Sequence, residues 1–210
     1  MDILEKNFQA VIEGDWDATL QLAQGALDAG HEAHAVMEAL VNGMDTVGEE
    51  WRVGNMFIPE VLRSAKAMHT GMDVLRPFLS AADAKLRGSV VIGTVQGDLH
   101  DIGKSLVAMM LEGAGFQVHD LGVDVSAAKF VEAVKTYQPN IVGMSSLLTT
   151  TLPFMRDTIR SLEEAGVRES VKVLIGGAPV TPEFADSIGA DGYAPDGATA
   201  VAKARELVGK

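Results

Sequence analysis

The sequence predicts an α/β protein in which a helical bundle precedes a doubly wound, five-stranded parallel sheet of the flavodoxin-like Rossmann type. Helical periodicity runs through residues 1–84, and from residue 89 onward short apolar runs alternate with helix-forming runs. Turns rich in glycine or hydroxyl groups follow the first, third and fourth apolar runs. We therefore predict a helical domain over residues 1–84 and an α/β domain over residues 89–210, joined by a linker at 77–88.

The helical domain is predicted to be an antiparallel bundle of about four helices. Asp2 and Asp15 are the expected N-caps of two short helices, and Gly14 and Gly30 punctuate them. Two long helices follow, and Pro59 fits the first turn of the second. Their apolar faces recur every three or four residues, at Met37, Leu40, Met44, Val47 and Trp51, and at Val61, Ala65, Met68, Met72 and Leu75.

Six of the ten methionines lie in this domain, and two interpretations of them stay open. Methionine fills irregular cores, which is the interpretation we favour, but mobile thioether side chains also suit the cover of a large flat ligand. Trp51 and Phe57 flank the turn between the two long helices and carry the same two interpretations.

Five strands are predicted in the α/β domain, at residues 90–95, 117–120, 141–144, 171–175 and 192–194. Helices are predicted between and after them, at residues 102–112, 127–136, 152–164, 182–187 and 198–208. Right-handed crossovers bring the ends of the first, third and fourth strands to one edge of the sheet, where open α/β folds bind ligands.

The composition excludes several classes of function. With 17 basic and 29 acidic side chains, the chain has a formal net charge of −12, which argues against nucleic acid or an anionic membrane as a partner. The absence of cysteine excludes disulfides, thiolate metal sites and cysteine nucleophiles. No apolar run reaches the roughly 18 residues of a membrane span, and the acidic N-terminus lacks the features of a signal peptide. We expect a cytoplasmic protein.

The turn after the first strand carries the strongest indication of function. It presents His100 between Asp98 and Asp101, and Gly97 and Gly103 bracket it. A ligating imidazole usually donates its second N–H to a carboxylate, and Asp98 is placed to accept it. Asp101 is expected to cap the following helix, and Gly103 leaves space for a ligand close to the backbone.

Two nucleotide-binding interpretations of this turn fail. Gly103-Lys104-Ser105 ends like a phosphate-binding loop, but Asp98 stands where that loop requires glycine. A carboxylate there would also repel phosphate. The dinucleotide pattern G-x-G-x-x-G is absent, because Gly97 and Gly103 are the only glycines of the turn.

The other two turns at this edge supply complementary groups. Hydroxyls at residues 145–146 and 149–151 can hydrogen-bond a carboxamide or the far side of the His–Asp pair, or can simply cap the helix near Leu152. Gly176-Gly177 is either a plain turn or a place where something flat and bulky passes beneath the sheet edge. Their meeting at one edge strengthens the functional interpretation.

Together these residues resemble a known family. Asp98-x-His100-x-x-Gly103, Ser145-x-Leu147 and Gly176-Gly177 are similar, in order and spacing, to the signature of cobalamin-binding domains of the methionine synthase type. The resemblance extends over roughly residues 35–205 and implies that the helical domain caps the corrin. It makes His100 the lower axial ligand of cobalt, in place of the cofactor's own benzimidazole, with Asp98 as the partner of His100.

The resemblance also implies which other residues meet the cofactor. Ser145 and Thr149 would line its nucleotide tail, Gly176 and Gly177 would make room for that tail, and Thr151 stands where methionine synthase has a second serine. The complete predicted set of cofactor-binding residues is Gly97, Asp98, Leu99, His100, Asp101, Ile102, Gly103, Ser145, Leu147, Thr149, Thr151, Gly176, Gly177 and Gly197.

The 210-residue length and the stretches at 147–151 and 176–180 look most like the corrinoid proteins of anaerobic methyltransferase systems. Such a subunit turns over only with partner enzymes. The resemblance implies a cofactor cycling between methylcob(III)alamin and cob(I)alamin, or a related corrinoid. A substrate:corrinoid methyltransferase would load the methyl group from methanol, a methylamine, a betaine or a methoxylated aromatic. A second enzyme would pass it to tetrahydrofolate or coenzyme M, and a reductive activator would maintain the cofactor.

Three alternatives are weighed against this interpretation. A mutase subunit shares the histidine turn but not the helical cap. A cobalamin-dependent sensor or regulatory module combines both domains, but normally adds a basic DNA-binding segment, which this acidic chain lacks. A receiver-like signalling domain requires an aspartate at the end of the third strand, where this chain has Met144-Ser145.

Overall fold

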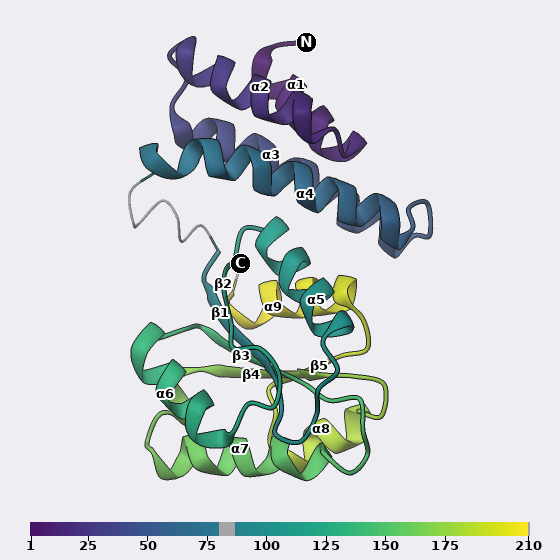
Figure 1. Cartoon of the computed structure of the whole chain (residues 1–210), viewed down its shortest axis with the longest axis vertical. Helices are drawn as coiled ribbons and strands as arrows, with labels where there is room; N and C mark the ends of the chain where they lie inside the picture. Colours follow the sequence, from purple (N-terminus) through teal and green to yellow (C-terminus); the bar gives the residue numbers. More distant parts are fainter. Residues whose placement is uncertain (80–86, 210) are drawn as a thin grey trace. The chain divides into compact units, whose positions relative to one another are not determined.

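The computed structural model describes residues 1–79 and 87–209. These residues form two compact units, one of residues 1–79 with 112–115 and the other of residues 87–111 with 116–209 (Figure 1). Most of the predicted linker at 77–88 lies outside the described residues. Within the described residues, no helix has both the length and the apolar character needed to cross a membrane.

The helical unit contains α1 (Ile3–Glu13), α2 (Trp16–Asp28), α3 (Ala33–Arg52) and α4 (Ile58–Leu75), followed by the short 3-10 helix η1 (Arg76–Phe78). The predicted N-caps are confirmed: the Asp2 carboxylate accepts the Glu5 N–H at 2.8 Å, and that of Asp15 accepts the Ala18 N–H at 2.9 Å. Pro59 lies in the first turn of α4, where its missing N–H is not needed.

The core of the helical unit follows the predicted apolar faces. Most of the predicted positions are buried, namely Met37, Leu40, Met44, Val47, Val61, Ala65, Met68 and Leu75. Trp51 and Met72 are only half-buried, and Phe57 is 69% exposed. Core packing therefore accounts for three of the six methionines of this unit, Met37, Met44 and Met68, and Phe57 is not part of the core.

The α/β unit is built on a parallel sheet in the order β2-β1-β3-β4-β5. Each strand lies within one residue of its predicted position: β1 (Ser89–Thr94), β2 (Gln117–Asp120), β3 (Ile141–Ser145), β4 (Lys172–Gly176) and β5 (Gly192–Ala194). The prediction of a doubly wound sheet is confirmed. The interior strand β1 is buried along its whole length, which explains its nearly continuous apolar run.

Helices cover both faces of this sheet. Figure 1 shows α5 (Ile102–Gly113) and α9 (Gly197–Leu207) on one face, and α6 (Ala127–Tyr137), α7 (Leu152–Glu164) and α8 (Pro182–Ile188) on the other. Phe130, Met155, Ile159 and Leu162 are buried against the sheet on the face of α6 to α8. This packing fixes the strands and therefore the turns at their carboxyl ends.

The turns after β3 and β4 approach each other very closely. Gly177 has a φ of +124°, and a Cβ added there would lie 1.9 Å from the carbonyl oxygen of Ser146. The N–H of Ser146 donates to the Gly176 carbonyl at 3.2 Å, so the two turns are also joined by their main chains. Only glycine satisfies both the backbone conformation and the contact distance at position 177.

Replacing Gly177 by alanine is therefore expected to lower the free energy of unfolding of the α/β unit by about 3 kcal/mol, through backbone strain and a steric clash. Gly189→Ala is the control, because Gly189 has a φ of +75° but no neighbour within 4 Å of an added Cβ. It should cost about 1 kcal/mol. Urea unfolding followed by tyrosine fluorescence measures both, since Tyr137 and Tyr193 lie in the α/β unit and the two tryptophans do not. Equal losses in both variants would contradict the role of the close contact.

Candidate functional site

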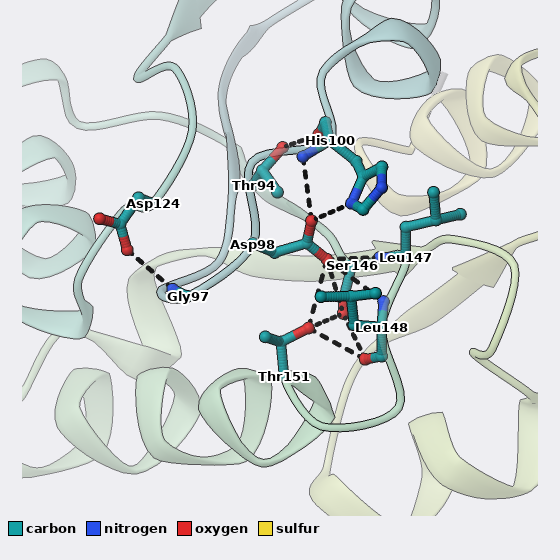
Figure 2. A network of polar contacts seen from close by, with 9 residues as sticks. All are labelled: Thr94, Gly97, Asp98, His100, Asp124, Ser146, Leu147, Leu148 and Thr151. Atoms are coloured by element: carbon teal, nitrogen blue, oxygen red, sulfur yellow. Dashed lines mark hydrogen bonds and ion pairs between the residues drawn. The ribbon is translucent and has the colours of Figure 1, made fainter.

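The turns after β1 and β3 converge around a single carboxylate, that of Asp98 (Figure 2). Parallel strands place all of their carboxyl ends at the same edge, so turns that lie far apart in the sequence become neighbours there. Asp98 is 0% exposed. A buried carboxylate needs a full set of hydrogen-bond donors, and the surrounding turns supply them.

One oxygen of Asp98 holds His100. Asp98 Oδ1 accepts the His100 main-chain N–H at 3.0 Å and lies 2.7 Å from His100 Nδ1. When Nδ1 carries the proton, the neutral imidazole donates to Asp98 and keeps its lone pair on Nε2. The carboxylate therefore fixes both the position and the tautomer of the ring.

The other oxygen faces the turn after β3. Asp98 Oδ2 accepts the main-chain N–H groups of Leu147 at 2.6 Å and Leu148 at 3.3 Å. Two buried hydroxyls complete the set, Thr151 Oγ1 at 3.2 Å and Ser146 Oγ at 3.4 Å. The hydroxyls of Ser146 and Thr151 also contact each other at 2.7 Å.

These contacts determine the charge of Asp98. Burial by itself raises the pKa of the carboxyl, but the N–H groups of His100 and Leu147, the His100 ring and the Thr151 hydroxyl together lower the pKa to about 2. Asp98 is therefore ionised throughout the neutral range. It acts there only as a hydrogen-bond acceptor.

The His100 ring is partly exposed to solvent. Its side chain is 51% exposed, and Nε2 has no hydrogen-bond partner among residues 1–79 and 87–209. Large apolar side chains of the same two turns are also unusually exposed, namely Leu99 at 72%, Ile102 at 90%, Leu147 at 45% and Leu148 at 39%. A fixed nitrogen lone pair among exposed apolar groups suits a large apolar ligand with an electrophilic centre.

The main chain of the histidine turn, residues 97–103, is held by other groups than those that hold the side chains of Asp98 and His100. The buried Thr94 hydroxyl donates to the His100 carbonyl at 2.9 Å. Lys104, also buried, pairs with Asp101 at 2.8 Å and with Asp120 at the end of β2. The Asp101 carboxylate accepts the Ser105 hydroxyl at 3.0 Å, so it anchors the start of α5 through side chains.

Glycines shape the space beside the histidine turn. A Cβ added at Gly103 would meet no atom within 4 Å, which leaves that face of α5 open. At Gly176 it would lie 2.6 Å from the Ala194 carbonyl oxygen. The backbones of β4 and β5 therefore approach each other there without intervening side chains.

The structure brings some of the predicted residues together and leaves others apart. Asp98, His100, Leu147 and Thr151 meet in one network (Figure 2). Gly97 joins it through Asp124, whose carboxylate accepts the Gly97 N–H at 2.7 Å. Three other predicted residues lie apart from it: Ser145 ends β3 and is half-buried, Thr149 is exposed, and Gly197 begins α9.

The sequence indicated Ser146 only as part of a hydroxyl cluster and Lys104 only as part of the rejected phosphate-loop pattern, and the roles of Thr94 and Asp124 were not predicted. The alternative spacing Ser146-x-Leu148 fits the same pattern as Ser145-x-Leu147 and would have indicated the buried hydroxyl. The polar Thr94 at the end of an apolar strand was a second available indication.

Within the described residues, no group of three or more His, Asp or Glu side chains is placed to hold a metal ion by itself. A metal bound through His100 would therefore bring most of its ligands with it. The donor set fits a corrinoid in this respect, because the protein offers one oriented imidazole, a flanking apolar surface and an open face at Gly103.

Comparison with known proteins agrees with this fit. Residues 88–203 and residues 3–76 match two family models, and both are described as a B12 binding domain. The chain is 45% identical to dimethylamine corrinoid protein 1 of Methanosarcina mazei, over all of this chain and 98% of that protein. It is 40% identical to a corrinoid protein of Desulfitobacterium hafniense, over all of this chain and 99% of that protein.

Solved structures of proteins named for cobalamin are also similar to this chain. The methanol:cobalamin methyltransferase complex MtaBC of Methanosarcina barkeri contains a chain that is 30% identical, with a TM-score of 0.89 over 99% of this chain and 80% of that one. A cobalamin-binding protein of Desulfitobacterium hafniense is 35% identical, with a TM-score of 0.78 over 99% of this chain and 98% of that one.

Replacing Asp98 by asparagine should lower the free energy of unfolding of the α/β unit by about 2–3 kcal/mol. An amide has only one acceptor oxygen, so its NH₂ group must face N–H donors that the carboxylate now satisfies. Urea unfolding at pH 7 measures the loss. Asp157→Asn on α7 is the control, because Asp157 pairs with the exposed Arg160 and should change stability by less than about 0.5 kcal/mol.

The difference in free energy of unfolding between wild type and Asp98→Asn should decrease as the pH falls. Because the pKa of Asp98 is lower in the folded protein than in the unfolded chain, its stabilisation is present in full above about pH 4 and is lost as the pH falls toward 2. A difference between wild type and Asp98→Asn that stays constant from pH 6 to pH 2.5 would contradict this assignment.

Proposed function

Because this chain belongs to the B12-binding family of corrinoid proteins, we propose that it is a methyl carrier that accepts a methyl group from one partner methyltransferase and delivers it to a second. A corrinoid is its cofactor. The observation that carries the proposal is the His100 imidazole, held at Nδ1 by a buried carboxylate and half-exposed at the carboxyl edge of the sheet.

His100 is the proposed lower axial ligand, bound through Nε2. When bound, the corrinoid supplies a cobalt centre that accepts and releases a methyl group. Asp98 orients the ring, holds the Nδ1 proton and keeps its own negative charge because its pKa is about 2. Ser146 and Thr151 hold the far oxygen of Asp98 and so prevent the carboxylate from rotating away from the histidine.

The remaining predicted cofactor contacts keep the status of proposals. Gly103 would let the corrin approach α5, and the exposed side chains of Leu99, Ile102 and Leu147 would cover its apolar surface. Gly176 and Gly177, where backbones already approach closely, would border the nucleotide tail, together with Ser145, Thr149 and Gly197. We also propose that residues 1–84 form the cap domain and residues 89–210 the cobalamin-binding domain.

For the methyl donor we propose a methylated amine or methanol. The similarity to dimethylamine and trimethylamine corrinoid proteins and to a methanol:cobalamin methyltransferase complex supports this choice. The other proposed partners are a methyltransferase for tetrahydrofolate or coenzyme M and a reductive activator. A betaine or a methoxylated aromatic donor is the alternative that the transfer experiment below distinguishes.

The ligand role of His100 predicts a specific absorption spectrum. Wild type reconstituted with cobalamin should show the bands of a histidine-ligated cofactor, and His100→Ala should lose those bands while retaining its fold by circular dichroism. His31→Ala is the control, because His31 is an exposed histidine between α2 and α3. Identical spectra for wild type and His100→Ala would rule out the ligand role.

The carrier role predicts transfer of a labelled methyl group. Wild type loaded with cobalamin is first reduced chemically to the cob(I) state, which accepts the methyl group, and is then incubated with ¹⁴C-dimethylamine or ¹⁴C-methanol and the matching methyltransferase of a Methanosarcina relative. The label should remain with the protein after gel filtration, and His100→Ala should retain at least about tenfold less. Labelling only from a betaine or a methoxylated aromatic would correct the proposed donor. A cofactor-loaded protein labelled by no donor would favour a sensor or regulatory module.

A further inference from the structure

Asp124, in the turn between β2 and α6, holds the main chain of the histidine turn at two adjacent residues. Its Oδ1 accepts the Gly97 N–H at 2.7 Å, and its own N–H donates to the Asp98 carbonyl at 3.0 Å. Figure 2 shows Asp124 reaching the start of the histidine turn from one side, while the hydroxyl-bearing turn reaches Asp98 from the other. One residue therefore makes a two-point clamp on Gly97 and Asp98.

The backbone of Asp124 is unusual in a way that the clamp requires. Among the described residues, Asp124 and Gln138 are the two non-glycine residues with a positive φ, +51° and +46°. Gln138 ends α6 in a left-handed C-cap, which is an ordinary reason for that conformation. Asp124 ends no helix. Its left-handed conformation accompanies an N–H directed at Asp98 and a carboxylate directed at Gly97.

The same turn also restrains the far end of the histidine turn. Asp120, the last residue of β2, pairs with the buried Lys104 in the first turn of α5 and accepts the Gly122 N–H at 2.9 Å. Residues 120–124 thus contact the chain on both sides of His100. The hydrogen bonds of the Asp98 carboxylate fix the imidazole relative to that carboxylate. Main-chain bonds between Thr94 and residues 122 and 125 hold the end of β1 against the turn after β2, and Asp124 extends this attachment to Gly97 and Asp98.

We propose that Asp124 is a positioning residue for His100, which clamps the Gly97–Asp98 main chain and so presents the imidazole before the corrinoid binds. This inference rests on the proposed ligand role of His100. It assigns to Asp124 no contact with the cofactor.

The clamp can be tested without changing the backbone conformation. Asp124→Gly removes the carboxylate but tolerates a φ of +51°, and Asp124→Asn keeps an acceptor oxygen. Gln138→Gly is the matched control, because it also replaces a left-handed residue by glycine but lies at the opposite end of α6. Three quantities are compared: the urea midpoint, hydrogen exchange in the corrinoid-free protein, and the dissociation constant for hydroxocobalamin.

In Asp124→Gly we expect the amides of residues 97–103 to exchange about three- to tenfold faster, and hydroxocobalamin to bind about three- to tenfold more weakly. The urea midpoint should match that of Gln138→Gly, and Asp124→Asn should restore both exchange and binding to within about twofold of wild type. Unchanged exchange at residues 97–103 would overturn the proposal. Faster exchange throughout the α/β unit, in parallel with a lower urea midpoint, would overturn it too, because it indicates a general structural role.

The two proposals fail in different ways. If His100→Ala binds hydroxocobalamin as wild type does and with the same spectrum, the ligand role fails, whereas hydrogen exchange at residues 97–103 still decides whether Asp124 clamps the turn. If His100→Ala behaves as predicted but Asp124→Gly matches wild type in exchange and binding, only the positioning role fails.

Discussion

The site depends on keeping one ionised carboxylate out of water. Asp98 is 0% exposed, and an uncompensated charge in that position would cost several kcal/mol. The fold compensates it with donors from two turns about 50 residues apart in sequence: the His100 N–H and ring on one oxygen, and two main-chain N–H groups with two hydroxyls on the other. Because the donors come from both turns, the carboxylate joins β1 to β3 and at the same time determines where the imidazole lies.

Such an arrangement requires that the turns approach each other more closely than side chains normally permit. The contact between Gly177 and the Ser146 carbonyl illustrates this requirement, since no Cβ fits between them. The Gly176 carbonyl accepts the Ser146 N–H, so the end of β4 holds the turn after β3, and that turn holds Asp98. The glycine pair is therefore needed for the geometry of the site itself, independently of any contact that it makes with a cofactor.

The sequence predicted the sheet well because a buried parallel strand needs a nearly continuous apolar run, and such runs are easily located. The turn containing His100 was also predictable, since a histidine between aspartates and glycines is unusual at a strand end. The partners of that turn were harder to predict. Whether Ser145 or Ser146 faces Asp98 depends on how the chain leaves β3, and a shift of one residue reverses the direction of the side chain. Asp124 was missed because its role depends on a left-handed backbone that aspartate adopts only in particular contexts.

The main chain and the side chains of the site are held by different groups, and this explains how His100 can be both exposed and fixed. A half-exposed imidazole has few packing contacts, so its orientation must come from Asp98 Oδ1 and from the backbone at Gly97 and His100. The turn after β3, with the Ser146 and Thr151 hydroxyls, fixes the Asp98 carboxylate. Thr94 fixes the His100 carbonyl, and the turn containing Asp124 fixes the main chain before the histidine. None of these groups occupies the Nε2 side of the ring. His100 Nε2 is thus oriented entirely from behind, which leaves its lone pair and the apolar surface around it available for the proposed contact with the corrinoid.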